Sequence, residues 1–243
     1  MKKYLLLFLM LTIGVTAQSQ VLITLLLGDK LNSPNLEFGL EGGINWTTIS
    51  GLESKEYASK WNLGFYFDIR IKNQWSLYTG VLVKSNMGVD KLTNNDLTTL
   101  NVSKIVYYDG EDIEGVYSHK MNTFLVPALL RYKFKNHLYA ELGPQFGLAY
   151  KSWIEFNSDV DGKDLVVKDF NKDKINLFDM GLTAGFGYTL FKGTGWTIGA
   201  KYYYGFLDVY KDVSGSNNSS FFLKLNIPIG AGEKPKKKDK TKG

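Results

Sequence analysis

Hydrophobic and polar residues alternate along residues 61–84, which read WNLGFYFDIRIKNQWSLYTGVLVK. From Trp61 to Ile71 every odd position is apolar or aromatic, and most even positions are polar. A polar break from Lys72 to Gln74 separates this run from a second alternating run that begins at Trp75. A period of two is typical of a β-strand, and so short a break predicts a hairpin.

Eight alternating stretches of this kind follow residue 35. They cover about residues 36–48, the hairpin at 61–84, 121–134, 137–150, 176–190, 195–208 and 219–229. Each is about as long as a tilted strand that crosses a membrane, roughly 9 to 11 residues. Short connections (72–74, 135–137, 191–195) alternate with long ones (47–60, 86–120, 151–175, 209–218). The sequence therefore predicts an all-β, eight-stranded antiparallel up-and-down barrel with tight turns on one side and long loops on the other.

The charged residues of these stretches share one face, and the other face carries none. The acids on this face are Glu37, Glu41, Asp68, Glu141 and Asp179, and the bases are Arg70, Lys84, Arg131, Lys201 and Lys224. Five acids against five bases fit a crowded interior, because an unpaired buried charge costs several kcal/mol. We expect these residues to form a structural ionic network in the lumen, together with Tyr66, Tyr78, Tyr139 and Tyr203. Since eight strands leave room only for side chains, the lumen should be plugged.

The tryptophans indicate that the apolar face contacts lipid. Trp46, Trp61 and Trp153 fall on the long-loop side, and Trp75 and Trp196 on the short-turn side. Tryptophan at both edges of an apolar band forms the aromatic belts of a membrane protein. A soluble, lipocalin-like barrel is the main alternative, but it would need an apolar interior for its ligand.

The two ends of the chain differ from the body. Lys2 and Lys3, an apolar run over 5–15, and the small residues Ala17 and Ser19 predict a signal peptide at 1–19. We expect a periplasmic segment at 20–35, the barrel at 36–230 and a Lys-rich disordered tail at 231–243. The net charge is +5, of which the two signal lysines carry +2 and the tail +4, leaving −1 for the body. The basic pI therefore gives no support to nucleic-acid binding.

Few residues offer catalytic or metal-binding chemistry. The chain has no Cys and two His, of which His119 follows Ser118 in a long loop. An adjacent Ser–His pair is a weak signal, because a catalytic triad is defined by geometry. The acidic runs at 109–112 and 159–164 lack the spacing of an EF-hand. We predict no enzymatic activity, no catalytic residue, no cofactor and no metal, and keep a rim enzyme and a small-solute channel as alternatives.

Five stretches carry a resemblance to a known family. They are LLLGDKLNSPNLEFGLEGGINWTTISG (25–51), FLVPALLRYKF (124–134), LYAELGPQFGLAY (138–150), FDMGLTAGFGYTL (178–190) and YYYGFLDV (202–209). Together they resemble the PorT-type family of small outer-membrane β-barrels of diderm bacteria, over nearly the whole mature chain. The more specific parts are the Pro, Leu-Leu and Tyr of 127–132 and the Glu, Gly-Pro and Gly of 141–147.

The resemblance implies a place and a role. It implies the outer membrane, and the strand count puts both termini in the periplasm. One branch of the family resembles a factor for secretion and surface maturation of exported proteins. We therefore expect an interaction or secretion/assembly-associated role through the long outer loops. The expected partners are outer-membrane lipid and lipopolysaccharide and other envelope or secretion proteins, with no nucleic acid.

Overall fold

The computed structural model describes residues 33–104, 107–108, 111–160, 162–193 and 195–229. The predicted signal peptide, most of the segment 20–35 and the tail 231–243 lie outside these ranges. The strands are β1 (Leu36–Ile49), β2 (Ala58–Lys72), β3 (Trp75–Val89), β4 (Tyr107–Tyr108), β5 (Glu111–Asp112), β6 (Val116–Lys133), β7 (Leu138–Val160), β8 (Lys163–Phe170), β9 (Phe178–Thr189), β10 (Thr197–Asp208) and β11 (Asn217–Pro228). The helices are α3 (Asn94–Thr99), η1 (Lys172–Lys174) and α4 (Leu190–Gly193).

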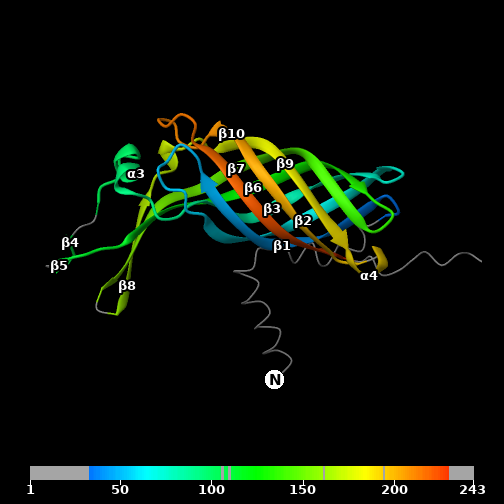
Figure 1. The fold of residues 1–243 in the computed structure, drawn as a ribbon, viewed down its shortest axis with the longest axis horizontal. Coiled ribbons are helices and arrows are strands. Elements are labelled where there is room, and N and C mark those ends of the chain that lie inside the picture. Colours follow the sequence, from blue (N-terminus) through cyan, green and yellow to red (C-terminus); the bar gives the residue numbers. More distant parts are fainter. Residues whose placement is uncertain (1–32, 105–106, 109–110, 161, 194, 230–243) are drawn as a thin grey trace, which may run out of the picture.

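Eight of these strands form a closed antiparallel ring in the order β1-β2-β3-β6-β7-β9-β10-β11. The pairing of β1 with β11 and of β6 with β7 leaves no open edge in the ring. Closure matters because every backbone polar group inside a bilayer needs a partner within the protein. The predicted eight-stranded up-and-down barrel is thereby confirmed (Figure 1).

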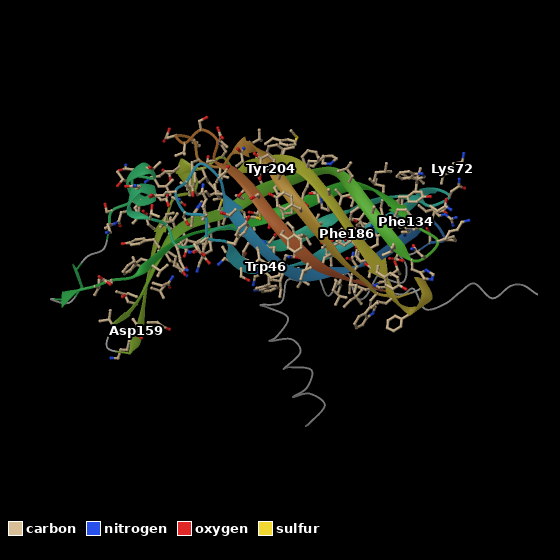
Figure 2. The ribbon with its side chains drawn as sticks, viewed as in Figure 1. Trp46, Lys72, Phe134, Asp159, Phe186 and Tyr204 are labelled. Atoms are coloured by element: carbon tan, nitrogen blue, oxygen red, sulfur yellow. The ribbon has the colours of Figure 1, made fainter. Side chains whose placement is uncertain are left out.

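The two ends of the barrel are unlike one another. The turn end carries the connections 73–74, 134–137 and 190–196, as well as the start of β1 and the end of β11. Asn73 has a φ of 53°, a left-handed conformation that suits its tight turn. The loop end carries the longer connections, and Figure 2 shows Asp159 beyond it, with Lys72 at the opposite end of the molecule. Within the described residues, no helix is long and apolar enough to cross a membrane.

The loop end has longer strands than the sequence pattern predicted. β6 begins at Val116 and β7 continues to Val160, beyond the predicted 121–134 and 137–150. The expected loop at 151–175 is largely a hairpin, in which β7 pairs with β8 from Trp153–Phe170 to Val160–Lys163. β6, β7 and β8 thus project past the ring (Figure 1).

Two bulges at this end reverse the alternation of side chains. Leu63 pairs with Lys84 and Gly64 with Leu82, so Val83 is an extra residue in β3. Thr123 pairs with Ala149 and Asn122 with Lys151, so β7 likewise gains one residue at Tyr150. Because side chains alternate with a period of two, one extra residue exchanges the faces of all that follow.

The outward face is apolar between the two ends. Half or more of the side chain of Leu142, Leu148, Phe178, Phe186 and Phe206 is exposed. Trp75 and Trp196 are 43% and 44% exposed at the turn end, and Trp61 is 48% exposed toward the loop end. Trp46 contacts Phe221 on the same outer face. An exposed apolar band edged by aromatic residues is typical of a membrane barrel.

Candidate functional site: the closed lumen and the loop-end rim

Arg131 organises the half of the lumen nearer the turn end. Its Nε and Nη2 donate to Glu141 Oε2 at 2.9 and 2.6 Å, and its Nη1 donates to Asp68 Oδ2 at 2.9 Å. The guanidinium also lies 3.8 Å from the ring centre of Tyr78 and 4.3 Å from that of Tyr139. All five side chains are buried, so each charge is matched by hydrogen bonds and ring faces where water is excluded.

Two lysines complete this ionic network. Lys224 donates to the second oxygen of Glu141, and Lys201 donates to Glu41 Oε1 at 2.8 Å. The hydroxyl of Tyr78 donates to Glu41 Oε2 and accepts from Asn226 Nδ2 at 2.6 Å. Three carboxylates and three cations are therefore fully buried and balanced. Such balance is what a buried cluster needs, because each isolated ion would carry a large desolvation cost.

Strand register and small residues create the space for this network. Arg131 and Glu141 are direct partners on β6 and β7, which fixes their contact. Tyr139 lies over the neighbouring strands β9 and β10 at Gly187 and Gly199, where an added Cβ would lie 2.4 and 2.2 Å from its hydroxyl. A methyl group at either position would collide with the ring, so these strand glycines admit the tyrosine.

The structure brings six of the ten predicted lumen residues into one contiguous network. They are Glu41, Asp68, Arg131, Glu141, Lys201 and Lys224. Glu37 lies at its edge, half-buried, and accepts a hydrogen bond from the Tyr66 hydroxyl at 2.8 Å. Lys133 also belongs to the network, because its Nζ lies 3.0 Å from Asp68 Oδ1. The ten predicted lumen residues did not include it. The alternation of β6 places Lys133 on the same face as Arg131, which is the signal that could have found it.

Three predicted members do not join the network. Arg70 is exposed, because it lies at the turn-end mouth of the barrel, where β2 ends two residues later. Lys84 follows the β3 bulge and points outward, with its Nζ 4.0 Å from the ring centre of Trp61. Asp179 is buried at the loop end and accepts from Asn218 Nδ2 at 2.9 Å, apart from the cations. The prediction was therefore wrong for Arg70 and Lys84 as lumen residues, and for Asp179 as an ion-pair partner.

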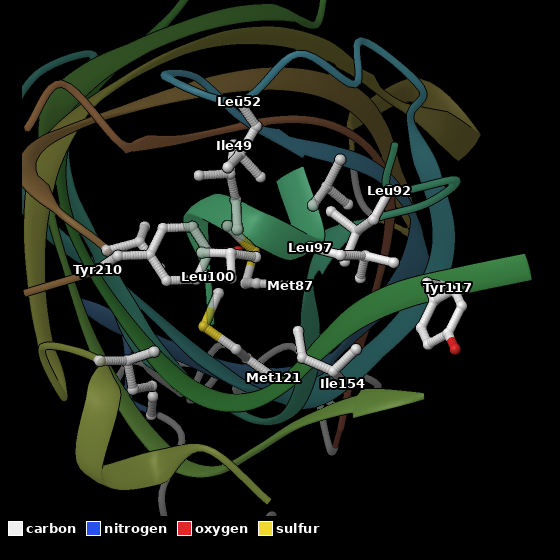
Figure 3. Packing of buried hydrophobic residues seen from close by; sticks show 14 of the residues in the cluster. Ile49, Leu52, Met87, Leu92, Leu97, Leu100, Tyr117, Met121, Ile154 and Tyr210 are labelled. Atoms are coloured by element: carbon white, nitrogen blue, oxygen red, sulfur yellow. The ribbon is translucent and has the colours of Figure 1, made fainter. Parts of the chain in front are cut away.

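The half of the lumen nearer the loop end is filled by apolar side chains, which the sequence pattern did not predict. The cluster joins residues of the barrel wall to residues of the connections (Figure 3). Members from the wall include Leu82, Met87, Met121, Leu125 and Ile154, and members from the connections include Leu52, Leu92, Leu97, Leu100 and Tyr210. The β3 bulge turns Met87 and Val89 inward, which explains why strict alternation missed them.

Helix α3 and the connection from β1 to β2 (residues 50–57, called the first loop) close this apolar half at the loop end. Thr93 caps α3 by accepting from the Asp96 amide at 3.2 Å, and Asp96 accepts from the Thr93 amide at 2.9 Å. The Asp96 carboxylate also accepts from the amides of Glu53 at 2.6 Å and Ser54 at 3.0 Å. Because Asp96 is buried, its three backbone donors replace water as partners and fix the first loop on the helix.

His119 lies in this loop-end half, beyond the exposed apolar band, and both nitrogens of its ring have hydrogen-bond partners. Its Nε2 lies 2.8 Å from Ser152 Oγ and its Nδ1 lies 2.7 Å from the Tyr210 hydroxyl. Ser152 in turn donates to Asn171 Oδ1 at 2.6 Å. All four side chains are buried, and burial lowers the pKa of His119 to about 3 and raises the pKa of Tyr210. A neutral, enclosed imidazole therefore connects β6, β7 and two connections of the loop end.

The rim-enzyme alternative required His119 beside Ser118 or an acid. Ser118 is the neighbouring strand residue and points to the opposite face from His119, whose hydrogen bonds go to Ser152 and Tyr210. His137 lies in a turn-end connection with a φ of 71°. In the described ranges, no three His, Asp or Glu side chains are grouped closely enough to hold a metal ion.

Trp153 differs from the other predicted belt residues. It points outward from the β7–β8 extension, where its Nε1 donates to Glu155 Oε2 at 2.9 Å. Glu155 also accepts from Lys120, and from Asn157 Nδ2 at 3.1 Å. Burial alone would raise the pKa of Glu155, but these hydrogen bonds outweigh it and lower the pKa to about 2. Trp153 therefore belongs to a charged cluster above the band.

A family model described as "Outer membrane protein beta-barrel domain" matches residues 17–211. The chain belongs to this family. Its place is accordingly the bacterial outer membrane. No curated protein is detectably similar to this chain in sequence.

Solved structures of other outer-membrane proteins resemble this family member only distantly. Ail, the attachment invasion locus protein of Yersinia pestis, is 11% identical with a TM-score of 0.39, over 81% of this chain and all of Ail. Neisserial surface protein A is 10% identical with a TM-score of 0.34, over 80% of this chain and 97% of its own. OprG of Pseudomonas aeruginosa is 12% identical with a TM-score of 0.28, over 79% of this chain and 91% of its own. Because these TM-scores are all below 0.5, the fold of this chain rests on its own closed ring of eight strands.

Proposed function

We propose that this outer-membrane barrel is closed to solutes and acts through its loop end as an interaction or secretion/assembly-associated factor. The observation that carries this proposal is the contrast between a lumen packed along its length and a β6–β7–β8 extension that stands free of the ring. The PorT-type resemblance supplies the secretion-related role, which extends beyond membership of the barrel family. Lipid of the outer membrane and other envelope proteins are the proposed partners.

The proposal includes an orientation. Membrane barrels with tight turns at one end and long loops at the other place the turns in the periplasm. We therefore assign the turn end, the start of β1 and the end of β11 to the periplasm, and the β7–β8 hairpin to the cell surface. Lys-specific protease added to intact cells should cut near Lys163, in the hairpin, and spare Lys72 at the turn end. Cleavage at Lys72 with protection of Lys163 would reverse this orientation.

The role is tested by photo-crosslinking in living cells. A photoreactive residue at Val166, which is 47% exposed on β8, should give adducts with envelope proteins that mass spectrometry identifies. The matched site is Lys72, at the other end of the same barrel. Identical adducts from both sites, or none from Val166, would contradict action through the loop end. Shortening the hairpin across 159–164 should then impair secretion of exported proteins while the barrel still inserts.

A small-solute channel is the second candidate. The buried ion pairs of Arg131 and the apolar cluster beneath α3 both lie across the path of a solute. Planar-bilayer recordings of the purified protein should therefore show no steady conductance. Reproducible single-channel steps that disappear in an Arg131→Ala variant would favour the channel instead.

A further inference from the structure

An open groove lies on the outer face of the barrel, where the exposed apolar band meets the loop end. It has a volume of about 570 Å³ and is lined by Phe170, Lys172, Asp173, Ile175, Asn176, Leu177 and Lys211. These residues come from the end of β8, the segment that contains η1, and the connection from β10 to β11. The groove therefore forms only when three separate parts of the chain meet.

Backbone hydrogen bonds fix the walls of the groove. The amide of Asn176 donates to Val209 O at 2.8 Å, and the amide of Lys211 donates to Lys174 O at 3.1 Å. The ammonium of Lys211 also donates to Asp173 O at 2.6 Å. The two connections thus hold each other, and the groove is a built feature of the rim.

The lower part of the groove continues the apolar band. Leu177 is 37% exposed, and next to it Phe178 is 51% exposed at the start of β9. Phe170 is 58% exposed on the other side. An acyl chain that lies along Leu177 and Phe178 would stay in contact with the protein as it enters the groove. The site therefore suits a ligand with an apolar part.

The upper part of the groove is cationic. Lys172 and Lys211 line it, and Lys151 lies 5.2 Å from the ring centre of Phe170 and 5.4 Å from that of Trp153. Among the ion pairs of the described residues, none involves Lys151 or Lys172. Lys120 and Lys168 share the single carboxylate Glu155, at 3.7 Å in the case of Lys168. The charged residues of the lining itself are Lys172 and Lys211 against Asp173, so the groove carries more cations than anions.

We propose that this groove binds the phosphorylated headgroup of an outer-leaflet glycolipid. Lys172, Lys211 and Lys151 hold the phosphate, and one acyl chain lies on Leu177 and Phe178. The excess of unpaired cations calls for an anion, and the apolar floor at band height calls for a lipid. The inference rests on the proposed orientation, which puts the loop end in the outer leaflet.

The test uses the full-length protein in detergent micelles that contain EDTA, with native mass spectrometry as the readout. The probe is hexa-acylated lipid A with two phosphates, compared with the same lipid after removal of both phosphates. Wild-type protein should retain the phosphorylated form at least 10-fold better. A K151Q/K172Q/K211Q variant should lose that preference, because it removes the phosphate contacts without touching the buried network.

A second variant serves as the matched control. K72Q/K135Q/K163Q also removes three exposed lysines, two at the turn end and one at the tip of the β7–β8 hairpin, and should bind like the wild type. Equal loss in both variants would overturn the proposal, since it would show a general effect of net charge. Equal binding of the phosphate-free lipid would overturn it as well.

Two further arms separate the lipid from free phosphate and from the proposed function. The phosphorylated disaccharide without acyl chains should compete at least 10-fold more weakly, and a Leu177→Ser variant should bind lipid A more weakly. Competition by the disaccharide at the strength of the lipid would refute a lipid site. Because this assay needs no partner protein, crosslinks from Val166 can persist when lipid A binding fails, and the reverse also holds.

Discussion

The two halves of the lumen are closed by opposite kinds of chemistry. Toward the turn end, Arg131 and two lysines neutralise three carboxylates, and all six side chains are buried. Toward the loop end, leucine and methionine side chains pack against α3 and the first loop. An ionic network demands complete pairing, whereas an apolar cluster depends on volume. The two halves should therefore respond differently to substitution.

The largest expected effect is that of Arg131→Ala. It leaves the carboxylates of Asp68 and Glu141 buried beside too few cations, and removing one partner of a buried pair costs about 3–5 kcal/mol. Urea unfolding in lipid vesicles measures this cost. Arg70→Ala is the matched control at an exposed arginine, expected within about 0.5 kcal/mol of the wild type. A similar loss of unfolding free energy in both variants would mean that the buried ion pairs of Arg131 do not add to the stability of the barrel.

Replacing Arg131 together with its two carboxylates and the lysines that pair with them tests the same ion pairs, while the Lys201–Glu41 pair stays in place. The triple variant Asp68→Leu, Arg131→Met, Glu141→Leu still leaves Lys224 and Lys133 without their carboxylates, so Lys224→Met and Lys133→Met are added. We expect this variant to be more stable than Arg131→Ala, because apolar replacement of a complete buried ion cluster is often neutral. The same unfolding measurement decides it. A lower stability than Arg131→Ala would show that the ions stabilise the barrel beyond their own pairing.

The next effect is at the apolar half. Leu97→Ala removes a buried side chain of α3 and should cost about 2–3 kcal/mol through the cavity that it leaves. The loss should appear as faster hydrogen exchange of residues 90–104, with β9 and β10 unchanged. Thr99→Ala, an exposed position on the same helix, is the control. Faster exchange throughout the barrel would instead mean that the two halves unfold together.

A smaller effect is expected at the Asp96 carboxylate. Asp96→Ala removes the acceptor of three backbone amides and should cost about 1–3 kcal/mol, with Asp96→Asn between it and the wild type. The rate of proteolysis within residues 50–57 reports the release of the first loop. Asn95→Ala provides the comparison on the same turn. An unchanged rate in Asp96→Ala would separate the first loop from α3.

The smallest effect is a dependence on pH. The folded pKa of His119 is about 3, below the ordinary value of 6.5, so protons bind the unfolded chain more readily between these values. The contribution of neutral His119 to the free energy of unfolding is therefore fully present above about pH 6.5 and is lost as the pH falls toward 3. A His119→Gln variant, compared with the wild type at pH 7 and pH 5, should lose less stability on acidification. Equal losses would assign the pH dependence to other groups.

The sequence predicts the barrel well because a membrane strand repeats one simple pattern. The eight alternating stretches, their short and long connections, and the contact of Arg131 with Glu141 all follow from a period of two. The turn-end half of the lumen was largely predictable for this reason, since its strands continue without a register shift until β2 ends at Arg70 and Lys72.

The loop-end half was not predictable in the same way. The bulges at Val83 and Tyr150 exchange the faces of the residues beyond them, so Lys84 points outward and Met87 inward. Helix α3 places Leu97 and Asp96 over the lumen through contacts with the first loop, which is distant in sequence. No local period of hydrophobic residues encodes such contacts. The extra length of β6 and β7 also carries polar residues on both faces, which hides it from a pattern of alternating hydrophobicity.

The hairpin strand β8 has one further consequence. In the described part of the chain it pairs with β7 alone, so its other margin presents open backbone donors and acceptors to water. Half of its eight residues are charged, namely Lys163, Asp164, Lys168 and Asp169. Charges along an open margin discourage a foreign strand from annealing there. Neutral residues at these four places should make β8 more prone to pair with β8 of another copy of the protein.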